Sequence, residues 1–312
     1  MKTKKILALL LAAVMLCSFA AACSSDEGEE TGGVKDTVVV AINGEPTKLT
    51  PYLDTSANNT IVEIQMLEPL FRMDNEGNVH PLLAESYEYE DETTLVVKLR
   101  EGVKFHNGEE MTSEDVKYSL ERCIANPGVN YNYLIIESIT CDDDYTVTIK
   151  TSAPFNALLY RLSLDAASII CKSADTSAEE FNKNPVGTGP FKFVSWELGG
   201  DVVLEAFEDY WGGAPAVKRV IFRTIPEALN RTIGLETGEV DLAYDLGITD
   251  LESLADNASV TTLTSPSTTV WYVGMNVQKA PFDNEKVRQA VAYALDPQGY
   301  IDLVFSGEAT PA

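Results

Sequence analysis

Positive charge is scarce in this sequence of 312 residues, which carries 23 lysines and arginines against 48 aspartates and glutamates, a formal net charge of −25. Nucleic-acid binding depends on cationic contacts to phosphate groups, so this balance excludes general nucleic-acid binding. It excludes electrostatic attraction to anionic lipid surfaces for the same reason. Apolar residues make up 45% of the chain, which is typical of a globular protein and not of a disordered one.

Side chains and motifs that carry catalysis are also few. The two histidines, His80 and His106, each lie beside a turn signal, which favours loop histidines over metal ligands or general bases. The sequence contains no GxSxG, HExxH, Walker A or GxGxxG motif. Carboxylates are plentiful, so a carboxylate-dependent hydrolase stays open, although no local motif singles out a pair. We therefore predict a protein that is not an enzyme and needs no metal or cofactor.

The five cysteines include no CxxC spacing, which excludes a zinc ribbon and a thioredoxin-type pair. Cys123 shares a helical face with Val116 and Leu120, so we expect a small buried hydrophobic residue there. A bridge between Cys141 and Cys171 stays open as an alternative to free thiols.

The first 22 residues have the layout of a secretory signal, with three lysines followed by an apolar run. A transmembrane anchor is the alternative, because the run of about 17 residues is near the lower limit for a span. Cys23 directly follows three alanines and resembles the lipidated cysteine of a bacterial lipobox, although Ala20 stands where that pattern prefers leucine. The resemblance implies a signal peptide over 1–22 and lipidation of Cys23. The polar, acidic residues 23–36 predict a solvated tether.

Strand and helix patterns alternate along the first part of the body. A β-branched run over 38–44 predicts a buried strand that ends in a turn. Apolar residues follow helical spacing over 55–73. Thr112, with Asp115 three residues later, predicts the start of a helix over 113–125. Residues 145–150 alternate as a strand does.

From residue 185 the pattern becomes richer in strands, and we find no internal repeat, which argues against an adhesin or a structural lipoprotein. A helix is expected from Pro226 to Gly238, a strand over 271–277 and an amphipathic helix over 283–295. The glycine-rich residues 187–191 lead into a strand and predict a turn, not a phosphate-binding loop. The patterns together favour a mixed α/β (α+β) class.

Four blocks in fixed order resemble one family. They are LEPLFRMDNEGNVHPLLAES (67–86), LREGVKFHNGEEMTSEDVKYSLER (99–122), NPVGTGPFKFVSW (184–196) and MNVQKAPFDNEKVRQAVAYALD (275–296). Together they are similar to the family 5 extracellular solute-binding proteins of ABC importers, the oligopeptide, dipeptide and nickel receptor group. The resemblance covers about residues 37–312 and implies a two-lobe fold of the type II periplasmic-binding-protein kind. It places the first lobe at 37–264, with an inserted subdomain at about 53–184, and an incomplete, C-terminally truncated second lobe at 265–312.

The family resemblance implies a lipid-anchored receptor on the extracytoplasmic face of the cell membrane. The expected partners are a peptide held between the lobes, the permease subunits of an ABC importer and the membrane through the lipid anchor, with the receptor a monomer. A nickel chelate or another small solute is the alternative ligand. A secreted carboxylate-dependent hydrolase is the alternative from a different class.

Two segments match the part of the family that lines the cleft. By position they are Thr55, Ser56, Ala57 and Asn58, and then Trp271, Tyr272 and Gly274. The alternative for the first segment is helix capping by Thr55 or Ser56, and for the two aromatics it is packing inside the second lobe. The family's aspartate for the peptide amino terminus has no counterpart before Ala312. We expect residues 23–312 alone to bind ligand poorly and to associate, because the apolar stripe over 287–295 would lack packing partners.

Overall fold

A computed structural model describes residues 35–265 and 270–311. The expected signal peptide, most of the tether and Cys23 lie outside these described residues. The chain divides into two units, Met1–Lys35 and Asp36–Ala312, and the second of them carries every element described below.

The main sheet has five strands in the order β11-β1-β10-β9-β8. Strand β1 runs parallel to both of its neighbours, β10 and β11, whereas β9 is antiparallel to β10 and to β8. The strands are β1 (Thr37–Ile42), β8 (Phe191–Trp196), β9 (Val202–Ala206), β10 (Arg219–Thr224) and β11 (Leu242–Ala243). The β-branched run predicted as a buried strand is therefore an inner strand of a mixed sheet.

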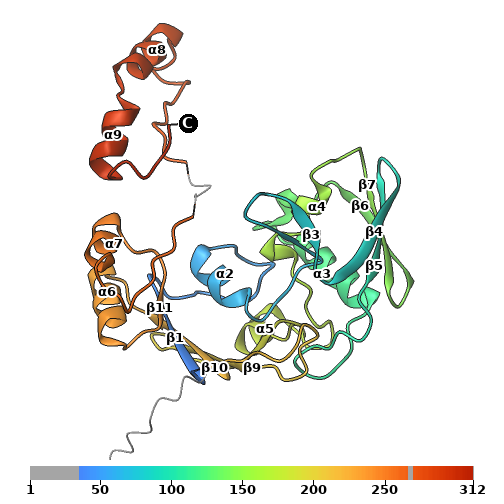
Figure 1. Cartoon of the computed structure of the whole chain (residues 1–312). Coiled ribbons are helices and arrows are strands. Elements are labelled where there is room, and N and C mark those ends of the chain that lie inside the picture. The colour runs from blue at the N-terminus through green and yellow to red at the C-terminus, as the bar shows by residue number, and fades with distance from the viewer. Residues whose placement is uncertain (1–34, 266–269, 312) are drawn as a thin grey trace, which may run out of the picture. The chain divides into compact units, whose positions relative to one another are not determined.

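The chain leaves this sheet after β1 and returns to it only at β8, and the residues between form a second region (Figure 1). Its four-stranded antiparallel sheet has the order β4-β5-β7-β6. The elements of this region are α2 (Ala57–Glu63), β2 (Phe71–Met73), β3 (Val79–Pro81), β4 (Ala84–Asp91), β5 (Thr94–Leu99), α3 (Ser113–Ala125), η1 (Asn130–Asn132), β6 (Ile136–Asp143), β7 (Thr146–Thr151), α4 (Leu158–Arg161), η2 (Asp165–Ala167) and α5 (Ala178–Lys183). The lobe and subdomain boundaries at 53, 184 and 264 stay predictions.

Helix α3 confirms its capping prediction. Thr112 is the N-cap, and its backbone N–H donates to the Asp115 carboxylate at 3.0 Å. Val116, Leu120 and Cys123 are fully buried on one face of this helix. The Cys123 Sγ donates to the carbonyl of Ala166 at 2.8 Å, and burial raises the pKa of this thiol to about 12, so Cys123 is an inert core residue.

The expected helix over 55–73 is wrong in its length. Only Ala57–Glu63 is an α-helix, and a turn and the short strand β2 follow it. The helix ends because the backbone that follows it, at residues 65–67, forms hydrogen bonds with the turn at 187–191 instead. Gly189 N donates to Met66 O at 2.9 Å, and Phe191 N donates to Gln65 O at 3.0 Å. A side chain at Gly187 would put its Cβ 2.3 Å from Met66 O, so only glycine permits this approach.

The last helices are α6 (Ala228–Thr237), α7 (Ile248–Leu254), α8 (Glu285–Ala294) and α9 (Pro297–Val304). Gly238 ends α6 with a φ of 72°, as the sequence predicts, but Glu227 is the N-cap and Pro226 precedes it. The amphipathic helix predicted over 283–295 is confirmed as α8, and none of its residues is buried. The described cysteines, Cys123, Cys141 and Cys171, are free thiols, so the Cys141–Cys171 bridge is wrong.

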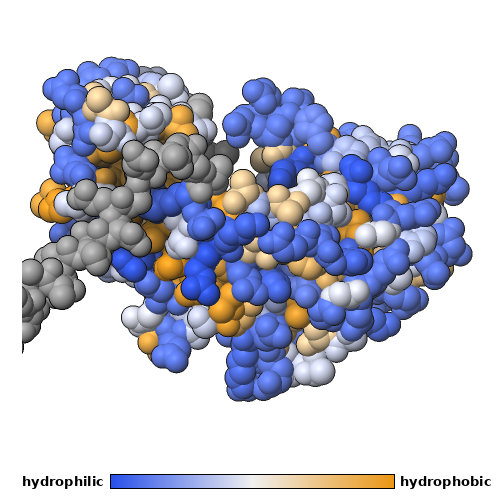
Figure 2. Space-filling view, turned by 60° about the horizontal axis from the view of Figure 1, so that its bottom comes forward, coloured by the Kyte–Doolittle hydropathy of each residue, from blue (hydrophilic) through white to orange (hydrophobic). Residues whose placement is uncertain are grey.

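Hydrophilic residues cover most of the face drawn in Figure 2, with hydrophobic residues in smaller groups between them. This pattern fits the excess of carboxylates in the sequence. Among residues 35–265 and 270–311, no helix has both the length and the apolar character that crossing a membrane requires.

Candidate functional site

The parallel strands β1, β10 and β11 end at one edge of the main sheet. Their last residues are Ile42, Thr224 and Ala243. In open sheets with parallel strands, ligands bind outside the carboxyl ends of those strands, where loops with free polar groups meet. We name this place the carboxyl edge and define it by Asn43, Gly44, Glu45, Thr55, Ser56, Asn58, Tyr244 and Asp245.

Arg231 of α6 holds two loops of the carboxyl edge in place. Its side chain is buried, and its guanidinium donates to the carbonyls of Ile225 at 2.7 Å, Pro226 at 2.8 Å and Asp245 at 2.6 Å. Asp245 has a φ of 58°, a left-handed conformation that aspartate tolerates better than most residues. The loops after β10 and β11 are therefore held together by hydrogen bonds to one buried guanidinium.

Polar side chains from β1 and β11 meet at the carboxyl edge. The Asn43 amide donates to the Asp245 carboxylate at 2.6 Å, and both residues are exposed. Glu45 is half-buried and accepts from the Trp196 indole at 3.3 Å. Among the described residues, the backbone N–H groups of Gly44 and Glu45 donate to no backbone carbonyl. Both residues are half-buried, so a ligand or water is left to accept from these groups.

The first predicted segment lies at this edge, at the start of α2. Thr55, Ser56 and Ala57 are exposed, and Asn58 is half-buried. A Cβ built on Gly44 would lie 2.3 Å from the Asn58 amide nitrogen, so Asn58 packs directly against the loop after β1. Ser56 is the N-cap residue of α2, but its side chain makes no capping hydrogen bond.

The Asp54 carboxylate accepts from Ser56 N at 3.1 Å and from the Asn59 side-chain amide at 3.3 Å. Neither bond caps a backbone N–H of the first turn of α2. The alternative role for the Ser56 hydroxyl, helix capping, is not observed. A ligand-binding role for Thr55, Ser56, Ala57 and Asn58 stays a prediction.

The second predicted segment is not a strand. Residues 270–276 have no regular structure, and Trp271 and Tyr272 are 71% and 84% exposed. The Trp271 ring packs instead against Phe305, with the ring centroids 6.0 Å apart. An aromatic and β-branched run becomes a strand only where its backbone pairs with a neighbour, and this run is unpaired. Ligand contact by Trp271, Tyr272 and Gly274 stays a prediction.

Sequence reasoning did not identify Asn43, Glu45, Tyr244 and Asp245 as site residues. The Asn43-Gly44 pair after a buried strand is a visible turn signal, but it does not tell which strands lie next to β1. Strand β11 has only two residues, too few for a periodic pattern to predict that Asp245 reaches the same edge.

The two histidines have different roles, and the expectation of a solvated loop residue is wrong for His106. Its Nε2 donates to Gly189 O at 3.0 Å, and its Nδ1 accepts from Gly187 N at 3.3 Å. Burial lowers the pKa of His106 to about 4, so the neutral ring is a structural part of the turn at 187–191. His80 is exposed and contacts the Asp74 carboxylate at 2.6 Å.

We expect His106 to make folding stability depend on pH. Because its pKa is near 4 in the folded chain and about 6.5 unfolded, the unfolded state binds the proton more tightly. The contribution of neutral His106 to the free energy of unfolding is complete above pH 6.5. It is lost as the pH falls toward 4, and the loss is about 3 kcal/mol at most. In urea unfolding from pH 7.5 to 4, His106→Gln should therefore show a shallower loss of stability than the wild type.

His80→Gln is the matched control for this measurement, since it replaces the exposed histidine. Its stability should change with pH in parallel with the wild type across the same range. Parallel curves for His106→Gln and the wild type would contradict a buried neutral imidazole.

No group of three or more His, Cys, Asp or Glu side chains in the described part of the chain is arranged to hold a metal ion. The carboxyl edge offers instead two amides, two carboxylates, three hydroxyls and two backbone N–H groups that donate to no backbone carbonyl of the described residues. Such groups bind a polar solute by hydrogen bonds, as in other ligand sites where a few placed polar groups fix orientation.

A family model described as bacterial extracellular solute-binding proteins, family 5, middle, matches residues 78–312. A glutathione-binding protein, GsiB, from Pectobacterium atrosepticum is 36% identical over 281 residues, which cover 88% of this chain and 54% of that protein. The chain therefore spans about half the length of the curated relatives that it matches.

Solved structures share the fold. The oligopeptide-binding protein AppA from Bacillus subtilis, in complex with a nonapeptide, has a TM-score of 0.78 and 30% identity, and the match covers 90% of this chain and 57% of AppA. NikA from Staphylococcus aureus, in complex with Ni(L-His)2, has a TM-score of 0.74 and 26% identity, covering 89% of this chain and 58% of NikA.

Proposed function

Because this chain belongs to the bacterial extracellular solute-binding proteins of family 5, we propose that it is the substrate-binding component of an ABC importer and carries out no catalysis of its own. In this role it captures a peptide-class solute at the carboxyl edge, outside the cytoplasm, and delivers it to the permease. The architecture is mixed α/β, and the structural relatives are two-lobe, type II periplasmic binding proteins.

The observation that carries this proposal is the open polar backbone of the carboxyl edge within this fold. Gly44 lies in the bend that ends β1 and Glu45 follows it, and among the described residues their N–H groups donate to no backbone carbonyl; an extended peptide can pair with such groups. Backbone pairing gives affinity that does not depend on the ligand's side chains. Asn58, in the same segment as the exposed Thr55 and Ser56, packs against Gly44.

Relatives of this fold bind different solutes: the GsiB relative is named for glutathione, AppA was solved with a nonapeptide and NikA with Ni(L-His)2. We favour a peptide for this chain because the carboxyl edge presents hydrogen-bonding groups suited to amides. The second lobe of the receptor would close over the solute, which stabilises the closed state by differential affinity.

Native mass spectrometry of the protein, purified without denaturation, tests the proposed ligand class. We expect added masses that match mixed short peptides. A single adduct with the mass of a metal chelate would contradict the peptide assignment. Turnover of a peptide or glycan library, abolished by one Asp or Glu substitution, would favour the hydrolase over the receptor.

We also propose that Cys23 is the lipidated residue, so that acyl chains hold the protein at the membrane. The protein without residues 1–22 has a formal net charge of −28, because the three lysines removed there leave 20 cations against 48 anions. Charge alone therefore cannot bind it to an anionic surface. We expect Cys23→Ser to abolish membrane retention or to leave the signal uncleaved.

Fractionation and intact mass measure the effect of Cys23→Ser. Cys17→Ser, a cysteine inside the expected signal, is the matched control and should leave both readouts unchanged. Normal processing and membrane partitioning of Cys23→Ser would overturn the lipobox assignment.

A further inference from the structure

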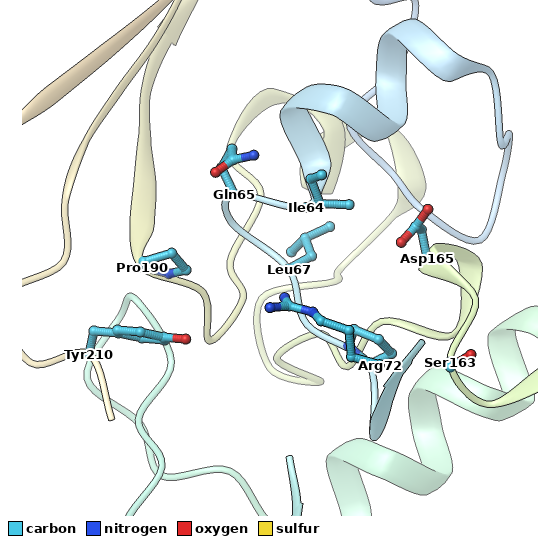
Figure 3. Close-up of a pocket in the computed structure, with 9 residues that line it drawn as sticks. Ile64, Gln65, Leu67, Arg72, Ser163, Asp165, Pro190 and Tyr210 are labelled. Atoms are coloured by element: carbon cyan, nitrogen blue, oxygen red, sulfur yellow. The ribbon is translucent and has the colours of Figure 1, made fainter. Parts of the chain in front are cut away.

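A cavity lies where α2 ends, and its lining shares no residue with the carboxyl edge. The cavity has a volume of about 310 Å³, the size of a small ligand pocket. Polar side chains from separate parts of the chain line it: Gln65 after α2, Arg72 of β2, Ser163 after α4, Asp165 of η2 and Tyr210 after β9. Figure 3 shows the Arg72 guanidinium and the Tyr210 hydroxyl directed toward the central space.

Arg72 is the cation of this cavity and has no fixed partner. Its guanidinium makes no hydrogen bond or ion pair with another described residue. Burial raises the pKa values of Asp165 and Tyr210, and the positive charge of Arg72 opposes both rises. Lys104, by contrast, is paired with Asp209 at 2.9 Å.

Burial also affects two acidic groups near this cavity. Burial raises the pKa of Asp165, and this effect outweighs the opposing effect of Arg72. Glu63, at the end of α2, is 2% exposed, its Oε1 has no hydrogen-bond partner, and burial raises its pKa well above the usual value. The Ser163 hydroxyl and the Gln65 amide can donate hydrogen bonds to an anion in this cavity.

The position of Tyr210 is fixed from outside the cavity. Its hydroxyl donates to the Glu68 carboxylate at 2.7 Å, and Glu68 is fully buried. The ring therefore forms a firm wall opposite Arg72, so that the space beside the guanidinium does not depend on a mobile aromatic side chain.

We propose that this cavity binds a carboxylate group of the solute, with Arg72 as its counter-ion. The planar guanidinium matches a carboxylate in a two-bond geometry. A phosphate dianion suits the cavity less, because one arginine would face two charges in a molecule with a net charge of −25. This inference rests on the proposed function, in which the solute is a peptide with a free carboxyl terminus.

Trialanine and trialanine amide are the probes, since they differ in the terminal carboxylate. Titrations followed by NMR give the dissociation constant of each and the shift of the Arg72 Nε–H resonance, assigned by its loss in Arg72→Gln. We expect trialanine to shift this resonance and to bind the wild type about 10-fold more tightly than its amide. Arg72→Gln should bind both probes equally.

Arg219→Gln is the matched control, because Arg219 is an exposed cation on β10 and its loss changes the net charge equally. This variant should keep the preference for the free acid. Equal binding of both probes to the wild type would overturn the carboxylate site and leave the peptide receptor standing.

N-acetylglycine, a small carboxylate without the peptide length, separates the two proposals. If it shifts the Arg72 resonance while no peptide binds, the carboxylate site holds and the peptide function fails. If neither N-acetylglycine nor trialanine moves the Arg72 resonance at saturating concentration, the carboxylate site is wrong.

Discussion

Asp175→Asn is expected to lower the free energy of unfolding by about 3–5 kcal/mol, one of the two largest effects of any single substitution discussed here. The Asp175 side chain is fully buried and forms an ion pair with Arg122, at 3.1 Å between Oδ2 and Nε. It also accepts hydrogen bonds from the hydroxyls of Tyr52 at 2.9 Å and Tyr118 at 2.9 Å. The neutral amide would leave the Arg122 cation, which also lies over the Tyr52 ring, without a counter-charge.

Urea unfolding measures this loss, and a double-mutant cycle isolates the pair. Because Arg122→Met removes the cation that Asp175 balances, Asp175→Asn should cost at least about 1 kcal/mol less in that background. Asp209→Asn is the matched control, since its exposed pair with Lys104 at 2.9 Å should contribute under about 1 kcal/mol. Additive losses in the cycle would contradict a coupled buried ion pair.

Glu68→Gln is expected to lower the free energy of unfolding by about 3 kcal/mol. The buried Glu68 carboxylate accepts three hydrogen bonds, from the Thr188 hydroxyl at 2.9 Å, the Tyr210 hydroxyl at 2.7 Å and the Trp211 indole at 2.8 Å. A glutamine offers one acceptor oxygen and two N–H donors, so at least one of the three donors would face another donor.

The same substitution should change the environment of Trp211. Its Nε1–H loses a charged acceptor, so we expect a shift in tryptophan fluorescence together with the loss of stability. Glu208→Gln is the control, because the pair of Glu208 with Lys218 at 3.1 Å is exposed. An unchanged unfolding curve for Glu68→Gln would show that the three donors find other partners.

The local parts of the fold follow directly from short-range patterns. The capping box at Thr112 and Asp115 predicts the start of α3 to the residue, because both partners of a cap lie within four positions. Gly238 ends α6 for a similarly local reason, since its φ of 72° is a glycine conformation. The β-branched run at the start of the body predicts β1, because a short apolar run of this kind that ends in a turn is itself a strand pattern.

Features that depend on distant contacts do not follow from such patterns. Helical spacing over 55–73 overestimates α2, because residues 187–191 take the backbone hydrogen bonds of Gln65 and Met66. His106 lies beside a turn signal in the sequence, yet the backbone of Gly187 and Gly189, about 80 residues away, makes it a buried structural group.

The residues of the candidate site also divide into those that the sequence predicts and those that it does not. The family resemblance selects the segment of Thr55 and Asn58, and the fold places Asn58 next to the loop after β1. No local sequence pattern identifies Asp245 or Arg72 as a site residue. The role of each depends on a partner or a cavity that remote segments of the chain form. A resemblance based on scaffold blocks therefore identifies the family before it identifies the residues that contact the solute.

Hydrogen–deuterium exchange of the backbone, with and without a peptide that native mass spectrometry has identified, tests the central claim most directly. If the carboxyl edge holds the solute, the peptide should slow exchange at residues 43–45, 55–58 and 244–247, while β4 to β7 of the four-stranded sheet exchange at their original rates. Protection confined to that sheet, or no protection at any of these residues at saturating peptide, would contradict the claim.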